Sequence, residues 1–509
     1  MKLPGNNLFL PLVRRTLSSI SNLGFGALLS VLILSIILSC SRNPVTGKKQ
    51  LSFMSTDQEK AMGAQSDPAV VAQFGRYENK EIQDFITREG NKMVKVSHRP
   101  DLPFEFKILN SPVVNAFALP GGYVYFTRGI LAHFSNEAEF AGVLGHEIGH
   151  VTARHGAEQY TNQILSQVGL MVGLVLSPTV RQFANELSQG VQLMLLSNSR
   201  AHESQSDELG VEYSTKIGYD ANYMANFFAT IGRISSQSGG DEIPTFLSTH
   251  PNPSDRFTRV HELATQWQNK LQLPAYKVNR NSYLEMIDGI IYGEDPREGY
   301  TDNGVFYHPQ LRFSFPYPNG WQLANTPQQV QMAPRDQNAL MLLSLAQGNS
   351  TEEAAQAFVQ NFSLTVVESN NKSVNGYPAL QLVADQVNEQ DPSQNIRLLT
   401  YFYQDRTNKL IYQMLGVAPK QEFSKFANYF LFTMDNFKSL TDPARINVKP
   451  DQIKVVTIPS SMTLQQALKR YNMPSNRYNE LAILNSMELN QPLQAKDKIK
   501  VVVKANVKP

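Results

Sequence analysis

Residues 144–155 read LGHEIGHVTARH and place two histidines, His146 and His150, four positions apart. Positions i and i+4 of an α-helix share one face, so both imidazoles can bind the same metal ion. Glu147 follows the first histidine and would lie near the open coordination position of that metal. The pattern therefore predicts a metal site with a carboxylate beside it, which is the arrangement of a metal-dependent hydrolase.

The segment around this pattern has residues that typically begin and end a helix. Asn136 can cap its N-terminus, and Glu139 follows three positions later. Gly156 comes directly after His155 and is a candidate helix terminator. We expect one helix from about Asn136 to His155 that carries both histidines.

A catalytic zinc site needs a third protein ligand, and residues 199–210 (SRAHESQSDELG) offer the best candidates. Glu203 and Asp207 are four positions apart and share a helical face. Glu203 can bind the metal, while Asp207 can accept a hydrogen bond from a ligating histidine. The alternative for this pair is a solvated charged face. His202 points about 100° away from Glu203 on a helix and is not expected to bind the metal.

Taken together, these motifs resemble the zinc metallopeptidase family of the CAAX prenyl proteases. That family also includes mitochondrial inner-membrane proteases and periplasmic outer-membrane assembly-enhancing proteases. Further matching pieces are NAFALPGG at 115–122, GIL at 129–131, and THP at 249–251 with Arg256. The resemblance spans roughly residues 45–265. It departs from the family at Gln205-Ser206, where members often have Glu-Ala.

The resemblance implies one zinc ion per chain, with His146, His150 and Glu203 as ligands and Glu147 as the general base. It also implies a mainly α metalloprotease domain of the zincin (gluzincin) type with a small β-sheet. Residues 117–120 (FALP) would then offer a strand edge along which a peptide substrate lies extended. A purely structural strand and turn is the alternative for these residues.

The segment THPNP at 249–253 is a stiff turn, because each proline restricts its own φ and the residue before it. In the family that the chain resembles, the histidine corresponding to His250 can occupy the open zinc position and keep the enzyme latent. Arg256 would brace the turn by hydrogen bonds to backbone carbonyls or to a carboxylate. Two alternatives stay open for His250, a donor to the oxyanion and a packing or helix-capping role.

The N-terminus has the features of a lipoprotein signal peptide over residues 1–39. Basic residues precede an apolar run, FGALLSVLILSIIL at 25–38, which is too short to span a bilayer. The run stops before Cys40, the only cysteine of the chain, and the site resembles the bacterial lipobox. We expect lipidation of Cys40, a periplasmic location and anchoring to the outer membrane; an uncleaved anchor is the alternative.

The rest of the chain is predicted to be multidomain. A polar tether over 40–56 precedes the metalloprotease domain, 57–292. An α+β domain follows at 305–440, which is similar to PsbP-like domains. A βααβ module at 450–509 resembles LysM modules, so peptidoglycan is a possible partner. A second apolar run, residues 164–176, is too short for a membrane span and is expected to be a packed helix.

The composition of the chain excludes several kinds of partner and site. The chain has 509 residues, with 46 Lys+Arg against 44 Asp+Glu, so its net charge of +2 argues against a nucleic-acid partner. One cysteine excludes an intrachain disulfide and a Cys-based zinc site. We therefore predict a zinc-dependent endopeptidase of the bacterial envelope that cleaves misfolded or misassembled proteins. The alternative is a chaperone or scaffold lipoprotein that binds unfolded envelope proteins or peptidoglycan.

Overall fold

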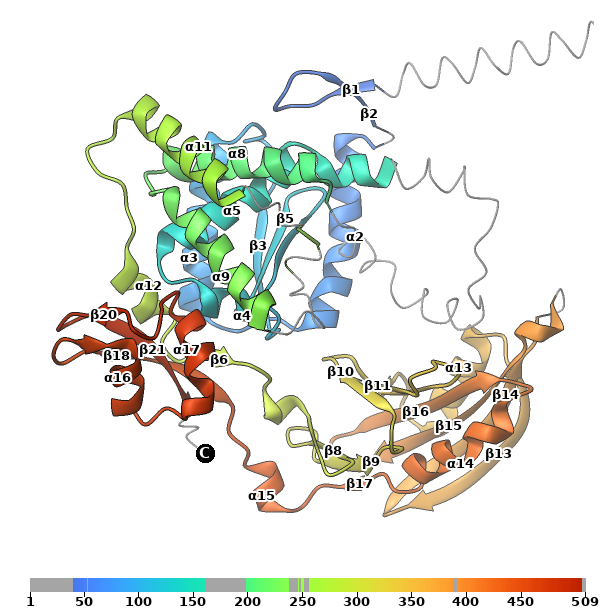
Figure 1. Ribbon diagram of the computed structural model, residues 1–509. Coiled ribbons are helices and arrows are strands. Elements are labelled where there is room, and N and C mark those ends of the chain that lie inside the picture. The colour runs from blue at the N-terminus through green and yellow to red at the C-terminus, as the bar shows by residue number, and fades with distance from the viewer. Residues whose placement is uncertain are drawn as a thin grey trace, which may run out of the picture.

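The computed structural model describes residues 40–52, 54–161, 198–237, 246, 249–250, 256–388 and 391–505. The predicted signal peptide, 1–39, and the apolar run at 164–176 lie outside these residues. Across the described part of the chain, no helix is both long enough and apolar enough to cross a bilayer. The described residues form a helical domain with a small sheet, a β-rich domain and a small C-terminal module (Figure 1).

The first described residues differ from the expected tether. Strand β1 (Cys40–Arg42) pairs with β2 (Lys49–Leu51) in an antiparallel hairpin. The Asn43 amide donates to the Ala153 carbonyl oxygen at 3.0 Å, and Asn43 Oδ1 accepts from the backbone of Val45 and Thr46. These hydrogen bonds give a polar segment a defined turn that its composition alone does not reveal.

The helical domain surrounds a three-stranded sheet in the order β3-β5-β4, in which β3 is parallel to β5 and β4 is antiparallel to it. In Figure 1 its blue to green helices lie around this sheet. The strands are β3 (Glu105–Leu109), β4 (Ala116–Leu119) and β5 (Tyr123–Thr127). The helices are α2 (Thr56–Phe74), α3 (Lys80–Val96), α4 (Arg128–His133), α5 (Glu137–Thr152), α8 (Arg200–Lys216), α9 (Asn222–Gln237), α11 (Arg256–Leu271) and α12 (Arg280–Met286).

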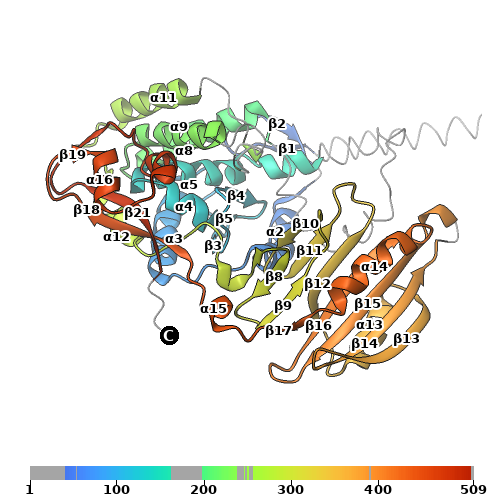
Figure 2. The same cartoon turned by 60° about the horizontal axis from the view of Figure 1, so that its bottom comes forward.

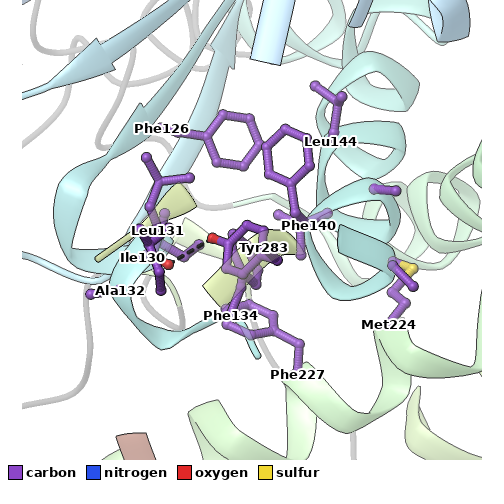
Figure 3. Close-up of a cluster of buried hydrophobic side chains, with 14 of the residues drawn as sticks. Phe126, Ile130, Leu131, Ala132, Phe134, Phe140, Leu144, Met224, Phe227 and Tyr283 are labelled. Atoms are coloured by element: carbon purple, nitrogen blue, oxygen red, sulfur yellow. Dashed lines mark hydrogen bonds between the residues drawn. The ribbon is translucent and has the colours of Figure 1, made fainter. Parts of the chain in front are cut away.

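Aromatic side chains fill the space between α5 and its neighbours (Figure 3). Phe140 of α5 lies 5.1 Å from Phe126 of β5, and Phe134 lies 4.5 Å from Phe227 of α9, measured between ring centroids. The buried Tyr283 hydroxyl of α12 donates to the Leu131 carbonyl at 2.7 Å. The first turn of α5 and the residues before it are therefore fixed in this core.

Helix α5 begins as the sequence predicts, with the Asn136 side chain accepting from the Glu139 backbone N–H at 2.9 Å. The predicted end at Gly156 is wrong. The helix ends at Thr152, because Arg154 has a left-handed φ of 64°. A new helical turn begins at His155. Arg154 is held in this conformation by Glu59 of α2, whose carboxylate accepts from its Nε at 2.5 Å.

The β-rich domain is built on an antiparallel seven-stranded sheet, ordered β10-β11-β12-β16-β15-β14-β13, with α13 (Thr351–Asn361) and α14 (Phe423–Met434) packed against it (Figure 2). Its buried apolar residues form clusters separate from that of the helical domain. The seven strands are β10 (Gln322–Asn325), β11 (Gln329–Ala333), β12 (Leu340–Ala346), β13 (Thr365–Val374), β14 (Tyr377–Gln386), β15 (Ile396–Asp405) and β16 (Leu410–Pro419). A four-stranded sheet contains β7 (Tyr300–Asp302), β8 (Val305–His308), β9 (Phe313–Pro316) and β17 (Lys438–Ser439).

The C-terminal module has two helices between two antiparallel strands, which pair over their whole length. Its first strand also pairs with β6 (Ile291–Tyr292), which follows the helical domain. Its elements are β18 (Asp451–Thr457), β19 (Met462–Thr463), α16 (Leu464–Arg470), α17 (Tyr478–Leu484), β20 (Pro492–Leu493) and β21 (Lys498–Lys504). Its buried side chains belong to the same apolar cluster as those of the helical domain. Burial of its apolar surface therefore depends on the helical domain.

A buried lysine joins the module to the start of α5. The fully buried Lys500 donates from Nζ to the carbonyl oxygens of Ala132 and Phe134, each at 2.9 Å. Burial lowers the pKa of Lys500 and raises that of Glu139, which lies in the first turn of α5. The module thus satisfies backbone carbonyls directly before the helix that carries His146 and His150.

We expect deletion of residues 450–509 to destabilise the helical domain, because it uncovers side chains of a shared core. Uncovering a few such side chains costs about 1.5–3 kcal/mol each. In a domain of this size the loss corresponds to a fall in Tm of ~10 °C or more. Differential scanning calorimetry of the zinc-loaded protein measures it.

The matched control replaces residues 305–440 by a short Gly-Ser linker, because the Tyr300 hydroxyl and the Arg445 carbonyl are 3.2 Å apart at the two ends of that domain. This variant should keep the Tm of the helical domain within a few degrees. Equal Tm values for the 450–509 deletion and the full chain would contradict a shared core.

Candidate active site

Helices α5 and α8 bring the predicted metal ligands together. His146 Nε2 lies 3.0 Å from His150 Nε2, as expected for residues one turn apart on α5. Glu203 of α8 lies between them, with Oε2 3.4 Å from His146 Nε2 and Oε1 3.4 Å from His150 Nε2. All three side chains are buried.

His250, whose role the sequence left open, also lies next to these three ligands. Its Nδ1 lies 3.0 Å from Glu203 Oε1 and 3.3 Å from His146 Nε2. One ligand atom from each of His146, His150, Glu203 and His250 falls within 4.8 Å of the others. Phe246 stacks on the His250 ring at 4.7 Å between centroids, and the Asn198 backbone N–H donates to the Thr249 carbonyl at 3.0 Å.

The donor set fits zinc. Three imidazole nitrogens and a carboxylate oxygen are the atom types and the number that tetrahedral zinc accepts. Glu203 Oε2 and both carboxylate oxygens of Glu147 are buried without a hydrogen-bond partner within the described part of the chain. Burial also lowers the pKa of His150 well below its usual value, which favours the neutral imidazole that binds metal.

Asp207 and Arg256 support this cluster from behind. Asp207 Oδ1 lies 3.0 Å from His146 Nδ1, on the side of that ring away from Nε2. Burial alone would lower the pKa of His146, but the carboxylates of Glu203 and Asp207 raise it to about 9. Arg256 makes a bidentate contact with Asp207, donating from Nε to Oδ2 at 2.8 Å and from Nη2 to Oδ1 at 2.7 Å. Its Nη1 lies 3.3 Å from Glu203 Oε2.

The partner of Arg256 is thus a carboxylate, one of the two options that the sequence left open. Arg256 also lies over the Phe228 ring at 4.0 Å and is only 3% exposed. It balances the charge of two buried acids, and the structure places it behind the metal-binding cluster.

Glu147 lies beside the cluster and is fully buried, with its Oε1 3.6 Å from His250 Nε2. Burial raises the pKa of the Glu147 carboxyl, opposed by the charges of His250 and His146. A carboxylate with a raised pKa that faces a metal position is suited to accept and return a proton.

Strand β4, which pairs only with β5 in the part of the chain that the structure describes, borders the same site. Residues Phe117 and Ala118 of β4 line a small cavity together with Glu147 and His250. The cavity has a volume of about 40 Å³, enough for a few water molecules and too small for a peptide residue.

Sequence reasoning missed two residues of this site, His155 and Gln205. His155 Nδ1 lies 2.9 Å from His150 Nδ1, and His155 Nε2 lies 2.9 Å from Gln205 Oε1. The Arg-His pair that ends the first motif was a possible signal. The bend at Arg154, which turns His155 back toward His150, was not visible in the sequence.

Residues 80–264 match the profile of peptidase family M48. They contain all four residues of the cluster. We refer to this matched region as the M48 domain. M48 peptidases are zinc-dependent, in agreement with the donor atoms found here.

Curated relatives of the M48 domain are named as proteases. A putative beta-barrel assembly-enhancing protease of Vibrio cholerae is 32% identical over 36% of this chain and 40% of its own length. The beta-barrel assembly-enhancing protease of Yersinia pestis is 30% identical over 44% of this chain and 47% of its own length. The mitochondrial metalloendopeptidase OMA1 of Arabidopsis thaliana is 33% identical over 34% of each. The chain thus spans less than half the length of these relatives.

Among solved structures, cyanobacterial PsbP from Synechocystis matches with a TM-score of 0.22 and 10% identity, over 28% of this chain and 91% of its own. A TM-score of this size carries no conclusion about the β-rich domain. The similarity of residues 305–440 to PsbP-like domains therefore stays a prediction.

We expect Arg256→Met to destabilise the metal-free protein strongly, because Asp207 and Glu203 would lose their buried counter-charge. Breaking such a buried pair typically costs about 3–5 kcal/mol. Urea unfolding of the metal-free full chain measures this free energy.

Arg259→Met is the matched control, because Arg259 also lies on α11 and pairs with Glu208 of α8 at the surface. An exposed pair of this kind contributes roughly 0–1 kcal/mol. Similar losses for both variants would show that the position of Arg256 in the site has no special weight.

Proposed function

We propose that the chain is a zinc-dependent endopeptidase that hydrolyses peptide bonds of misfolded or misassembled envelope proteins. The observation that carries the proposal is the buried set His146, His150 and Glu203 with Glu147 beside it, within an M48 domain. The names of two relatives, beta-barrel assembly-enhancing proteases, support envelope proteins as substrates. A chaperone without proteolysis would not need this set of buried donors.

The residues divide the work of hydrolysis. His146, His150 and Glu203 would hold the zinc ion, which when bound acidifies water at its open position and polarises the scissile carbonyl. Glu147 takes a proton from the attacking water and returns it to the leaving amine. Asp207 keeps the proton of His146 on Nδ1, so that Nε2 faces the metal, and Arg256 fixes the position of Asp207.

Strand β4 would hold the substrate. Because β4 pairs only with β5 among the described strands, its other edge would accept an extended peptide by main-chain hydrogen bonds. This edge carries Phe117 and Ala118, which line the same cavity as Glu147. A peptide paired there would present its backbone to the general base.

His250 acts in this proposal as a latch. Its Nδ1 is among the donor atoms that could bind the metal together with those of His146, His150 and Glu203, and its ring is buried. A fourth protein ligand leaves no open position for water, so the conformation with His250 in place is latent. Activation then requires His250 to leave the cluster.

Location and further partners follow from the sequence. We propose that lipidation at Cys40 anchors the chain to the outer membrane from the periplasmic side. Peptidoglycan binding by the LysM-like C-terminal module would give the chain a second attachment to the envelope. Since this module shares the core of the M48 domain, its glycan binding has to be measured in the full chain rather than after truncation.

We expect Glu147→Gln to fold, to keep about one zinc ion per chain, and to lose at least ~100-fold in turnover, because general-base catalysis contributes that much or more. Casein cleavage and metal analysis of the same preparation measure the two quantities. Glu208→Gln, at an exposed position of α8, is the control and should cleave normally. Proteolysis by Glu147→Gln at the wild-type rate would refute the assignment of the base.

We expect His250→Ala to raise basal proteolysis, because removal of the imidazole opens the fourth position of the metal. If His250 instead stabilises the oxyanion, activity should fall by about 100-fold or more. The matched control is His261→Ala on α11, because the hydrogen bond and the ring contact of that histidine are both made to Phe257 of the same helix. Lower or unchanged activity in His250→Ala would exclude the latch.

A further inference from the structure

His155 lies behind His150, on the side of the ring opposite the metal-binding cluster. His150 Nε2 faces His146 Nε2 at 3.0 Å, whereas its other nitrogen, Nδ1, faces His155 Nδ1 at 2.9 Å. A neutral imidazole that binds metal through Nε2 carries its proton on Nδ1. In the metal-binding form, His150 Nδ1 must therefore donate this hydrogen bond, and His155 Nδ1 must accept it.

The hydrogen bond made by the second nitrogen of His155 is consistent with this donor–acceptor direction. His155 Nε2 lies 2.9 Å from Gln205 Oε1, and an amide oxygen can only accept a hydrogen bond. The proton of His155 is therefore on Nε2, which leaves Nδ1 as an acceptor.

The ring plane of His155 is also fixed. His202 of α8 stacks on it at 4.3 Å between centroids with an interplanar angle of 15°. The Ser206 hydroxyl lies 3.3 Å from its Nδ1. Contacts on the face and at the edge thus hold His155 where its Nδ1 meets His150.

We propose that His155 and Gln205 are positioning residues that hold His150 in the Nδ1-protonated tautomer needed to bind zinc. The inference rests on the proposed zinc site. His146 has a carboxylate behind it, Asp207, whereas His150 has a neutral chain of two residues. The two histidine ligands are therefore oriented by different chemistry.

The test is zinc affinity of the full-length protein, measured by competition with a chromophoric chelator. His155→Phe keeps a ring of similar size but removes the acceptor, and we expect zinc binding to weaken by about 10–100-fold, as is usual when the partner of a ligating histidine is lost. His155→Asn keeps an acceptor oxygen close to the position of Nδ1 and should restore most of the affinity. This rescue would not occur if His155 served only to fill space.

Two further variants keep the test decisive if His155→Phe does not fold. Gln205→Leu removes the acceptor for His155 Nε2 at a half-buried position and should weaken zinc binding several-fold, whereas Gln205→Glu keeps an acceptor and should not. His261→Phe on α11 is the control, because it makes the same change at a histidine that has no hydrogen bond or ring contact with His150 or His155 among the described residues. Its zinc affinity should equal that of the wild type.

Wild-type affinity in both His155→Phe and Gln205→Leu would overturn the inference, as would equal weakening in His155→Phe and His155→Asn. The proposed function fails in a different way, because it requires that the wild-type chain binds zinc and that Glu147→Gln is inactive. A wild-type protein that cleaves and binds zinc normally, with unchanged affinity in His155→Phe, would refute the positioning role alone.

Discussion

The close approach of helices α5 and α8 is the constraint on which the site depends. A Cβ on Gly145 would lie 2.8 Å from the Gly210 carbonyl oxygen, and one on Gly210 would lie 3.0 Å from the Gly142 carbonyl oxygen. Any larger residue at these positions would push the helices apart. Because His146 lies on one helix and Glu203 on the other, a wider spacing would separate the metal ligands.

Close packing also buries the charged groups of the site. Glu147, Glu203 and Asp207 are each fully buried, and such carboxylates are costly unless they are paired or bind metal. Arg256 supplies a permanent positive charge to two of them, while a zinc ion would supply the rest. The same packing therefore has two effects. It raises the pKa of Glu147, which suits that carboxylate to proton transfer, and it makes Arg256 necessary as a counter-charge for the other two acids.

The C-terminal module and the β-rich domain differ in how they relate to the site. The C-terminal module contributes Lys500 to the carbonyls before α5 and shares its apolar core, so it is part of the scaffold of the M48 domain. The β-rich domain has its own cores and leaves and returns near Tyr300 and Arg445. Changes within the cores of that domain would thus leave the packing of α5 unaltered.

The sequence by itself determined the local part of the site. His146, Glu147 and His150 follow from helical spacing, and the cap at Asn136 follows from residue type, because both are properties of neighbouring residues. Glu203 and Asp207 were found as candidates by spacing, although only the packing of α8 on α5 shows which ring each one faces. The arrival of His250 at the cluster, the pairing of Arg256 with Asp207, and the turn at Arg154 that brings His155 behind His150 were decided by tertiary structure. These contacts join residues far apart in the sequence or depend on a backbone angle that buried partners impose, and no local pattern encodes either.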